Sequence, residues 1–431
     1  MTLPILDIVV IGAGHAGLSI SYWLKRLQVN HLVFEKGCIG ETWRNQRWDS
    51  LKLNTPTSVN LLPGQDNFLT DPDEFWTAGE FVSLLEDYTH NFQLPVHEGC
   101  EVLSVEKIQG SEHFLVSVSE KDSVKKYRCK LVIAASGFQN KKHIPVISKN
   151  ISNEILQLHS SEYKNPSLLP DGAVLVIGSA QSGVQIAEDL IDAGRQIYLS
   201  TSRVGRVPRR YRGKDIVEWL ILSGFFDEKT ADINDPAILK ARFAQVSGVG
   251  KRGHTVSLQS LAHKGAVILG KAINADSSVL SIQPDVINNI RFADDASMNI
   301  KSMIDKLIIK SGSEVPGPEE DAADLPDESG ACASTETLLN LNRNKISSVI
   351  WATGFEIDLS YLKVPVVDGT GLLKHHEGIS EIEGIYFPGL PWMRKRKSGV
   401  ILGIREDAEF ITRKIMEKYP GMISREKLSI L

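Results

Sequence analysis

The chain has 431 residues, of which 42% are hydrophobic and 23% are charged, a balance that is typical of a globular protein. This length exceeds one ordinary hydrophobic core and predicts two domains. The net charge of −5 disfavours general nucleic-acid binding, and no apolar stretch approaches the roughly 20 residues that a membrane helix needs.

A glycine-rich turn near the N-terminus follows the apolar residues 8–11, which predict a buried strand. Its GxGxxG spacing lets the backbone approach a pyrophosphate, and a helix expected from about His15 to Leu27 directs its positive end to the phosphates. A second strand over residues 31–34 ends in Glu35, whose carboxylate can accept both ribose hydroxyls of an adenosine. The pattern predicts a dinucleotide site formed by Gly12, Gly14, His15, Ala16, Gly17, Glu35 and Lys36.

A polar and aromatic loop over residues 40–73 comes next, followed by a helix predicted from about Gly79 to Phe92. Alternating apolar residues then predict strands near 101–107, 113–118 and 127–134.

A second glycine-rich turn, at residues 178–183, lies between a strand predicted over 173–177 and a helix predicted from about Ser182 to Ala193. Ala180 replaces the middle glycine, and its methyl group limits how closely a phosphate can approach. The next strand, residues 196–199, ends without an acid and leads into hydroxyl groups and an arginine, which can bind a ribose 2′-phosphate. This favours NADPH, with NADH as the alternative; the predicted ligands are Gly178, Ser179, Gln181, Ser182, Gly183, Ser202, Arg203, Arg209 and Arg210. The competing interpretation of these arginines is a solvated basic loop.

The four cysteines, at positions 38, 100, 129 and 332, form no CxxC or CxxxxC pair. Flavoproteins that reduce disulfides pass electrons to a close cysteine pair, so electrons from a flavin must leave this chain another way. The cysteine spacing also predicts no zinc or iron–sulfur site. Because the apolar N-terminus contains the first turn and lacks a basic lead, we do not expect it to be a signal peptide, and we expect a cytoplasmic protein without membrane insertion.

Two dinucleotide turns in one chain imply two redox cofactors, most simply a flavin and the nicotinamide that reduces it. We predict an α/β fold of two Rossmann-like dinucleotide-binding domains, with the NADPH domain inserted into the FAD domain. The FAD domain comprises residues 1–165 and 350–431, and the NADPH domain comprises residues 166–349. Within the insert, residues 311–336 are expected to form a mobile surface loop. A helix from about Asp407 to Glu417 closes the first sheet.

Further motifs follow in order along the chain: residues 40–44 and 47–51, Asn54-Thr55-Pro56, Ala135-Ser136-Gly137, residues 159–163 and Ala352-Thr353-Gly354-Phe355. Together with the two turns they resemble the class B flavoprotein monooxygenases, in particular the single-component flavin-containing monooxygenases and their bacterial homologues labelled for potassium transport. The resemblance covers nearly the whole chain. Its linker signature is only partly matched ahead of His159, which is expected to be a hinge or linker histidine, with a proton donor as the alternative.

In this family NADPH reduces FAD, and O2 then adds to flavin C4a to give a (hydro)peroxide that oxygenates the substrate. The resemblance therefore implies an NADPH-dependent FAD monooxygenase acting with O2 on a small amine, sulfide or ketone. The cofactor supplies the difficult chemistry in such enzymes, which fits a sequence without a convincing catalytic triad or carboxylate pair.

The resemblance also assigns individual residues. Asn54 is the catalytic candidate, because it is expected in the loop facing the flavin, where its amide can hydrogen-bond the flavin or the nicotinamide. The alternative for Asn54 is a turn residue ahead of Pro56. FAD is expected to contact Thr42, Trp43, Arg44, Trp48, Gly137, Thr353 and Gly354, with core packing as the alternative for Trp48. Ser398 and Gly399 are expected near the pyrimidine edge of the flavin.

Two other functions stay open from the sequence. One is an NAD(P)H oxidase or dehydrogenase of the same fold that produces H2O2 or reduces a quinone. The other is a redox-sensing flavoprotein that regulates a transporter. The oligomeric state is also open, a homodimer included.

Overall fold

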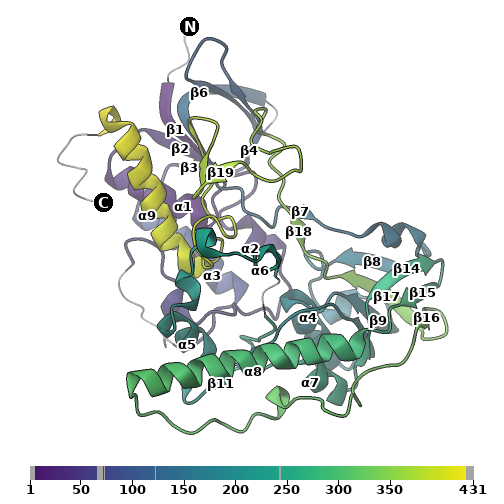
Figure 1. The fold of residues 1–431 in the computed structure, drawn as a ribbon. Helices are drawn as coiled ribbons and strands as arrows, with labels where there is room; N and C mark the ends of the chain where they lie inside the picture. The colour runs from purple at the N-terminus through teal and green to yellow at the C-terminus, as the bar shows by residue number, and fades with distance from the viewer. Residues whose placement is uncertain (1–4, 66–70, 72, 122, 242–243, 424–431) are drawn as a thin grey trace.

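The computed structural model describes residues 5–423 except 66–70, 72, 122 and 242–243. The ends of the predicted first domain and part of the predicted 40–73 loop therefore lie outside the described residues. The elements form two groups that lie side by side, each built on its own sheet (Figure 1). We call them the first unit and the second unit in the order in which the chain enters them.

The first unit is built on a nine-stranded sheet whose central strands run parallel in the order β3-β2-β1-β6-β21. An antiparallel meander, β4-β5-β6, and a hairpin, β19-β20, extend the sheet. The strands are β1 (Ile5–Ile11), β2 (His31–Phe34), β3 (Val96–His97), β4 (Cys100–Lys107), β5 (Phe114–Glu120), β6 (Ser123–Ala134), β19 (His375–His376), β20 (Ile379–Ser380) and β21 (Ile385–Tyr386). The helices of this unit are α1 (His15–Arg26), α2 (Glu41–Asn45), α3 (Ala78–Asn91) and α9 (Ile401–Lys418).

The second unit is built on a five-stranded parallel sheet in the order β13-β10-β9-β17-β8. Its strands are β8 (Leu156–His159), β9 (Ala173–Ile177), β10 (Ile197–Ser200), β13 (Val267–Leu269) and β17 (Ile346–Trp351). A three-stranded antiparallel sheet and a short hairpin are added: β14 (Ala272–Asp276), β15 (Val279–Ile282), β16 (Leu338–Asn340), β11 (Arg210–Tyr211) and β12 (Lys214–Asp215). The helices are α4 (Gln181–Asp192), α5 (Ile216–Leu222), α6 (Pro236–Lys240), α7 (Leu258–His263) and α8 (Val286–Ser311).

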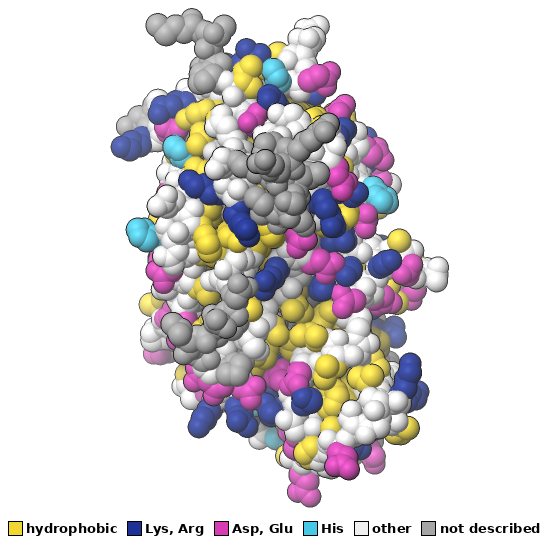
Figure 2. Space-filling view, turned by 90° about the vertical axis from the view of Figure 1, so that its left-hand side faces the viewer, with side chains coloured by type: hydrophobic (Ala, Val, Ile, Leu, Met, Phe, Trp, Pro, Cys, Tyr) yellow, Lys and Arg dark blue, Asp and Glu magenta, His cyan; other side chains and the backbone are white. Residues whose placement is uncertain are grey.

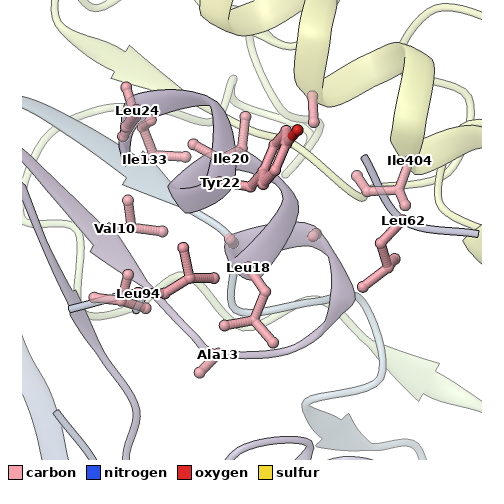
Figure 3. Packing of buried hydrophobic residues seen from close by; sticks show 14 of the residues in the cluster. Val10, Ala13, Leu18, Ile20, Tyr22, Leu24, Leu62, Leu94, Ile133 and Ile404 are labelled. Atoms are coloured by element: carbon pink, nitrogen blue, oxygen red, sulfur yellow. The ribbon is translucent and has the colours of Figure 1, made fainter. Parts of the chain in front are cut away.

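Each sheet has its own hydrophobic core. In the first unit α1 packs between the sheet and α9, so that Leu18 and Ile20 lie among Val10 and Ile133 of the strands and Ile404 of α9 (Figure 3). The side chains of this cluster are almost fully excluded from water, and each large aliphatic residue buried in this way stabilises the fold by about 1.5–3 kcal/mol. The second core contains Val176 of β9, Ile186 of α4 and Ile350 of β17.

The chain crosses between the units through two segments that pair with each other. The strand β7 (Lys141–Lys142) runs antiparallel to β18 (Phe355–Glu356), and Figure 1 shows this pair between the two sheets. The hydroxyl of Thr353 donates to the carbonyl oxygen of His143 beside it. The outgoing and returning chains are thus one structural element.

The sheets differ in extent from the predicted domains. The strand β8 ends at His159, ahead of the predicted boundary at residue 166, yet it belongs to the second sheet. The strand β17 also continues past residue 349 to Trp351. The strand β8 pairs with β17, and β17 pairs with the central strand β9, so the passage out of the first unit lies earlier in the chain than residue 166.

The segment 311–336, which was expected to be mobile, is anchored to α8. The carboxylate of Asp324, 8% exposed, accepts from the Ser297 hydroxyl at 2.6 Å and from the Lys301 ammonium at 2.7 Å. It also pairs with Arg206, which bonds Asp294 of α8 at 2.9 Å. The buried arginine therefore ties the segment, α8 and the chain after β10 together.

We expect Asp324→Ala to destabilise the protein by about 3 kcal/mol, because it leaves the buried Arg206 with only one carboxylate and Lys301 with none. Denaturant unfolding would measure this loss, and limited proteolysis should then cut within 311–336. The exposed Glu320 of the same segment provides the control, since Glu320→Ala should change neither property. Equal unfolding midpoints for both variants would contradict the anchoring.

Candidate functional site

The first glycine of each turn has the same unusual geometry. Gly12 follows β1 with φ +103° and Gly178 follows β9 with φ +107°, a region that side chains rarely adopt. A Cβ on Gly12 would lie 2.6 Å from the carbonyl oxygen of Ala135, and one on Gly178 would lie 2.4 Å from that of Ala352. Both positions therefore require glycine, and both turns lie against the end of the neighbouring strand.

The third glycine of each turn is required by the fold, whereas the second position is not. A Cβ on Gly17 or Gly183 would lie within 2 Å of the carbonyl oxygen of the first glycine in its turn, so both must be glycine. A Cβ on Gly14 would meet no described heavy atom within 4 Å. Its backbone (φ −81°, ψ −177°) matches that of Ala180 (φ −73°, ψ −174°) in the second turn. The fold therefore tolerates alanine at Gly14, and glycine there leaves space in front of the turn.

Two polar side chains face the first turn. The carboxylate of Glu35, buried at the end of β2, accepts from the backbone N–H of Ala13 at 2.8 Å and of Gly37 at 3.0 Å. Burial raises its pKa. His15 begins α1, and burial lowers the pKa of its ring to about 4, so the ring is neutral near pH 7. Its buried Nε2 has no hydrogen-bond partner within the part of the chain that the structure describes.

The corresponding strand end in the second unit carries hydroxyl groups in place of a carboxylate. The backbone N–H of Ser202 donates to Oγ of the buried Ser179 at 3.0 Å, which closes the turn onto the strand end. Arg203 follows and is exposed, and no carboxylate among the described residues forms an ion pair with it. This arrangement agrees with the predicted contrast between the two strand ends.

Arg209 and Arg210 occupy different environments, although the sequence presented them as equivalent. Arg209 is 1% exposed, pairs with Asp215 and donates from Nη1 to the Asn54 carbonyl oxygen at 2.9 Å. Its guanidinium also lies over the Phe75 ring, 4.6 Å from the centroid. The expectation that Arg209 meets a phosphate is therefore corrected to an internal contact. Arg210 is only half-buried and donates to a backbone carbonyl at 2.9 Å.

Asn54 lies where the two units meet. Its Oδ1 accepts from Nε2 of Gln185 on α4 at 3.0 Å, and its carbonyl oxygen accepts from Arg209. The preceding carbonyl oxygen, of Leu53, leaves no room for a Cβ on Gly248 of the second unit, at 2.0 Å. Among the described residues the amide Nδ2 of Asn54 has no acceptor, so this donor is available to a ligand.

The loop before Asn54 contains a half-buried cation. The Arg47 guanidinium lies 4.8 Å from the Trp43 ring centroid and donates to Gln139 Oε1 at 2.5 Å. Burial lowers its pKa to about 10, and no described carboxylate forms an ion pair with it. A half-buried guanidinium without a carboxylate partner is suited to an anionic ligand.

Three other residues of this loop that were predicted to contact FAD lie in different environments from that of Arg47. Thr42 is half-buried in α2, and Arg44 is exposed and pairs with Glu86 of α3 at 2.6 Å. Trp48 is 4% exposed and packs in the core of the second unit with Val174. This position supports core packing, which was the alternative to FAD contact for Trp48.

The remaining predicted residues lie at the strand ends beside the turns. Gly137 follows β6 with φ +78°, and Gly354 follows β17 with φ +85°. His159 is fully buried, with Nε2 2.9 Å from the Gly354 carbonyl oxygen and Nδ1 2.8 Å from Ser161 Oγ. These contacts give His159 a structural position at the chain crossing. Gln181 donates to a backbone carbonyl, Lys36 is exposed, and Ala16, Ser182 and Gly183 lie in the first turns of α1 and α4.

Three cations of the basic run at residues 394–397 pair across the units, whereas Arg394 pairs with Asp407 of its own unit. Arg396 and Lys397 bond Glu228 and Asp227, which lie in and beside the 3₁₀ turn η4 (Phe225–Asp227) of the second unit. Three backbone bonds, such as Arg396 N–H to the Glu228 carbonyl at 2.9 Å, run alongside. The buried Ser398, expected near a flavin, accepts from the Lys395 N–H at 3.2 Å. The run is thus an inter-unit contact that the sequence did not reveal.

Within the described residues no helix is long and apolar enough to cross a bilayer, and no group of three or more His, Cys, Asp or Glu side chains is placed to hold a metal. All four cysteines are free. On the face drawn in Figure 2, basic and acidic side chains are interspersed.

The chain is similar to known oxidoreductases. A family model described as pyridine nucleotide-disulphide oxidoreductase matches residues 9–256. An uncharacterized oxidoreductase, CzcO-like, of Geobacillus kaustophilus (strain HTA426) is 31% identical over 418 residues, which cover 96% of this chain and 99% of the relative.

Two solved structures share the fold. A flavin-containing monooxygenase from Stenotrophomonas maltophilia has a TM-score of 0.63 at 18% identity, covering 96% of this chain and 99% of its own. A bacillithiol disulfide reductase, Bdr (YpdA), from Bacillus cereus has a TM-score of 0.61 at 16% identity, covering 96% and 100%. At these identities the likeness shows the fold alone. It confirms the predicted α/β architecture of two Rossmann-like units and, at the level of fold, the resemblance to flavin monooxygenases.

One titratable contact behind the second turn predicts a pH effect. His254 donates from Nδ1 to the Val249 carbonyl at 3.0 Å and from Nε2 to Glu188 of α4 at 2.8 Å. The hydrogen bond to Glu188 raises the pKa of His254 above its usual value of 6.5. Because the folded pKa is raised, this stabilisation is fully present below pH 6.5 and is lost as the pH rises through the folded pKa.

The melting temperature of the wild type should therefore exceed that of His254→Gln most at acidic pH, and the difference should shrink towards about pH 8.5. Glu188→Gln should remove the same pH-dependent part of the melting-temperature difference, because it removes the carboxylate that stabilises the charged His254. A difference that stays constant between about pH 5.5 and 8.5 would contradict the pairing.

Proposed function

The chain belongs to the pyridine nucleotide-disulphide oxidoreductase family, and we propose that it is an NADPH-dependent FAD monooxygenase. The first unit would bind FAD, the second unit would bind NADPH, and the substrate would be a small amine, sulfide or ketone. The observation that carries the proposal is the position of Asn54: a loop of the first unit presents a free amide donor while bonded to the helix behind the second turn.

Five features at and near the first turn fit FAD. Gly14 leaves the front of the turn open, α1 directs its N-terminal N–H groups there, and Glu35 lies at the strand end where ribose hydroxyls would bind. The unpartnered Nε2 of His15 and the carboxylate-free guanidinium of Arg47 can both bond an anionic, oxygen-rich ligand.

The second turn fits NADPH. The methyl group of Ala180 reduces the space in front of the turn, but the N-terminus of α4 is left open to a pyrophosphate. A 2′-phosphate would meet hydroxyls and the exposed Arg203 in place of a carboxylate.

Bound FAD would supply the redox chemistry by accepting hydride from the nicotinamide and passing electrons to O2. The protein's own residues would bind and orient the two cofactors and exclude water. Asn54 would donate its amide N–H to the flavin or the nicotinamide, with Gln185 and Arg209 holding the loop in place. Such a site needs no acid–base side chain of its own.

Oxygenation is favoured over disulfide reduction by the cysteines. Cys100 and Cys129 are buried, and burial raises the pKa of the Cys129 thiol to about 12. Cys38 and Cys332 are widely separated in the sequence, and none of the four is bonded to another. No described thiol pair is therefore available to take electrons from a flavin.

The proposal is tested by reducing the purified flavoprotein anaerobically with NADPH and mixing it with O2. Flavin absorbance and H2O2 should be followed together. We expect reduction by NADPH, and oxygenated product with little H2O2 when an accepted amine, sulfide or ketone is present. Stoichiometric H2O2 with every compound would favour the oxidase, and the absence of reduction by NADPH or NADH would reject both functions.

Gly14→Ala should separate folding from cofactor binding. The methyl group meets no described atom, so unfolding free energy should change by less than about 1 kcal/mol. FAD occupancy of the purified protein should fall roughly tenfold, because the methyl lies where a pyrophosphate approaches. Ala180→Gly is the matched control and should leave FAD occupancy unchanged. Wild-type FAD content in Gly14→Ala would remove the first turn from the site.

Asn54→Asp keeps an oxygen for Gln185 but removes the free amide donor. We expect anaerobic reduction by NADPH to persist while oxygenated product falls roughly 10²-fold and H2O2 rises. The exposed Ser58 of the same loop provides the control, since Ser58→Ala should match the wild type. If product formation by Asn54→Asp equals that of the control, Asn54 is only a turn residue.

A further inference from the structure

The segment that follows β10 is bonded to parts of the chain that lie far away in the sequence. Thr201 begins the segment after the strand, and its Oγ1 donates to the Leu269 carbonyl at 2.7 Å. The same oxygen accepts from Nδ2 of Asn289, a buried residue of α8, at 3.1 Å. Because this hydroxyl is already bonded on both sides, Thr201 joins α8 to the strand end and leaves ligand contacts to the residues that follow.

Arg203 is held by the same helix. Its guanidinium lies over the ring of Phe292, 4.4 Å from the centroid, one helical turn after Asn289. Phe292 is half-buried and Arg203 is exposed, so the ring supports one face of the guanidinium and leaves its N–H groups towards solvent. A cation–π contact of this kind restricts a flexible arginine without using its hydrogen-bond donors.

Two of the neighbouring arginines cannot replace Arg203. Arg206 is 1% exposed and bonded to Asp294 and Asp324. Arg209 is equally buried and bonded to Asp215. Arg210 is half-buried and donates to the Gly213 carbonyl at 2.9 Å, whereas Arg203 is exposed and is the arginine nearest in sequence to the end of β10.

We propose that Phe292 is a positioning residue for the ribose 2′-phosphate: its ring holds the Arg203 guanidinium ready at the end of β10 and thereby sets the preference for NADPH over NADH. The inference rests on the proposed function, in which the second unit binds NADPH. It adds α8, a helix far along the chain from the second turn, to the determinants of nicotinamide specificity.

The test uses binding of 2′,5′-ADP and 5′-AMP to the full-length protein, measured by calorimetry, because these probes differ only in the 2′-phosphate and need no flavin chemistry. Phe292→Leu keeps an apolar side chain but removes the aromatic face. It should weaken 2′,5′-ADP roughly three- to tenfold and change 5′-AMP by less than about twofold. Phe292→Tyr keeps the ring and should restore wild-type binding.

A double-mutant cycle makes the assignment specific. Arg203→Ala should weaken 2′,5′-ADP, and adding Phe292→Leu to it should have no further effect, because the ring acts only through the arginine. In turnover, the KM for NADPH should rise in Phe292→Leu while the KM for NADH and kcat stay unchanged, a split that a general loss of stability would not produce.

Two results would overturn the inference: unchanged 2′,5′-ADP binding in Phe292→Leu, or equal weakening of both probes. If the wild type itself does not prefer 2′,5′-ADP to 5′-AMP, the NADPH assignment in the proposed function fails as well. A wild-type preference that survives in Phe292→Leu removes only the role of Phe292.

Discussion

The architecture depends on a contact that only glycine permits. In each unit the first glycine of the turn lies against the carbonyl oxygen that ends the neighbouring strand, and the third glycine lies against the first. A single methyl group at these positions would push helix, turn and strand apart. In each unit the contact therefore brings together the helix N-terminus and the end of the neighbouring strand. The segment after that strand is residues 135–137 in the first unit and residues 352–354 in the second.

Sequence reasoning succeeded where the signal is local. The helices α1 and α4 begin at the glycine turns as expected, because strand, turn and helix are adjacent in the chain. It failed where the partners are distant. The sequence around Arg209 does not show that this arginine, and not Arg210, bonds Asp215 and the carbonyl oxygen of the distant Asn54. The helix α8 was not predicted, because it buries Asn289, Asp294 and Ser297, whose polar partners lie elsewhere and obscure the apolar period.

Within the described residues, the units are joined at several places. The crossing strands β7 and β18 pair directly, the Asn54 loop bonds to α4 and Arg209, and residues 394–397 bond to the turn at 225–228. The last contact changes the meaning of the basic run. Four consecutive cations suggest a surface for an anionic partner, yet their acidic partners are supplied within the chain. Lys395, Arg396 and Lys397 pair with the second unit, and Arg394 pairs with α9.

The discontinuity of the first unit has a consequence for synthesis. β21 pairs with β6, and α9 covers α1, yet both are encoded after the entire second unit. On the ribosome, the apolar face of α1 and one side of β6 emerge early and stay uncovered until the C-terminal residues are made. The second unit, whose sheet lies within residues 156–351, is complete before then. The first unit therefore begins to be made first but finishes folding last. A protein truncated after the second unit would have a complete second sheet, and the core of its first unit would lack β21 and α9.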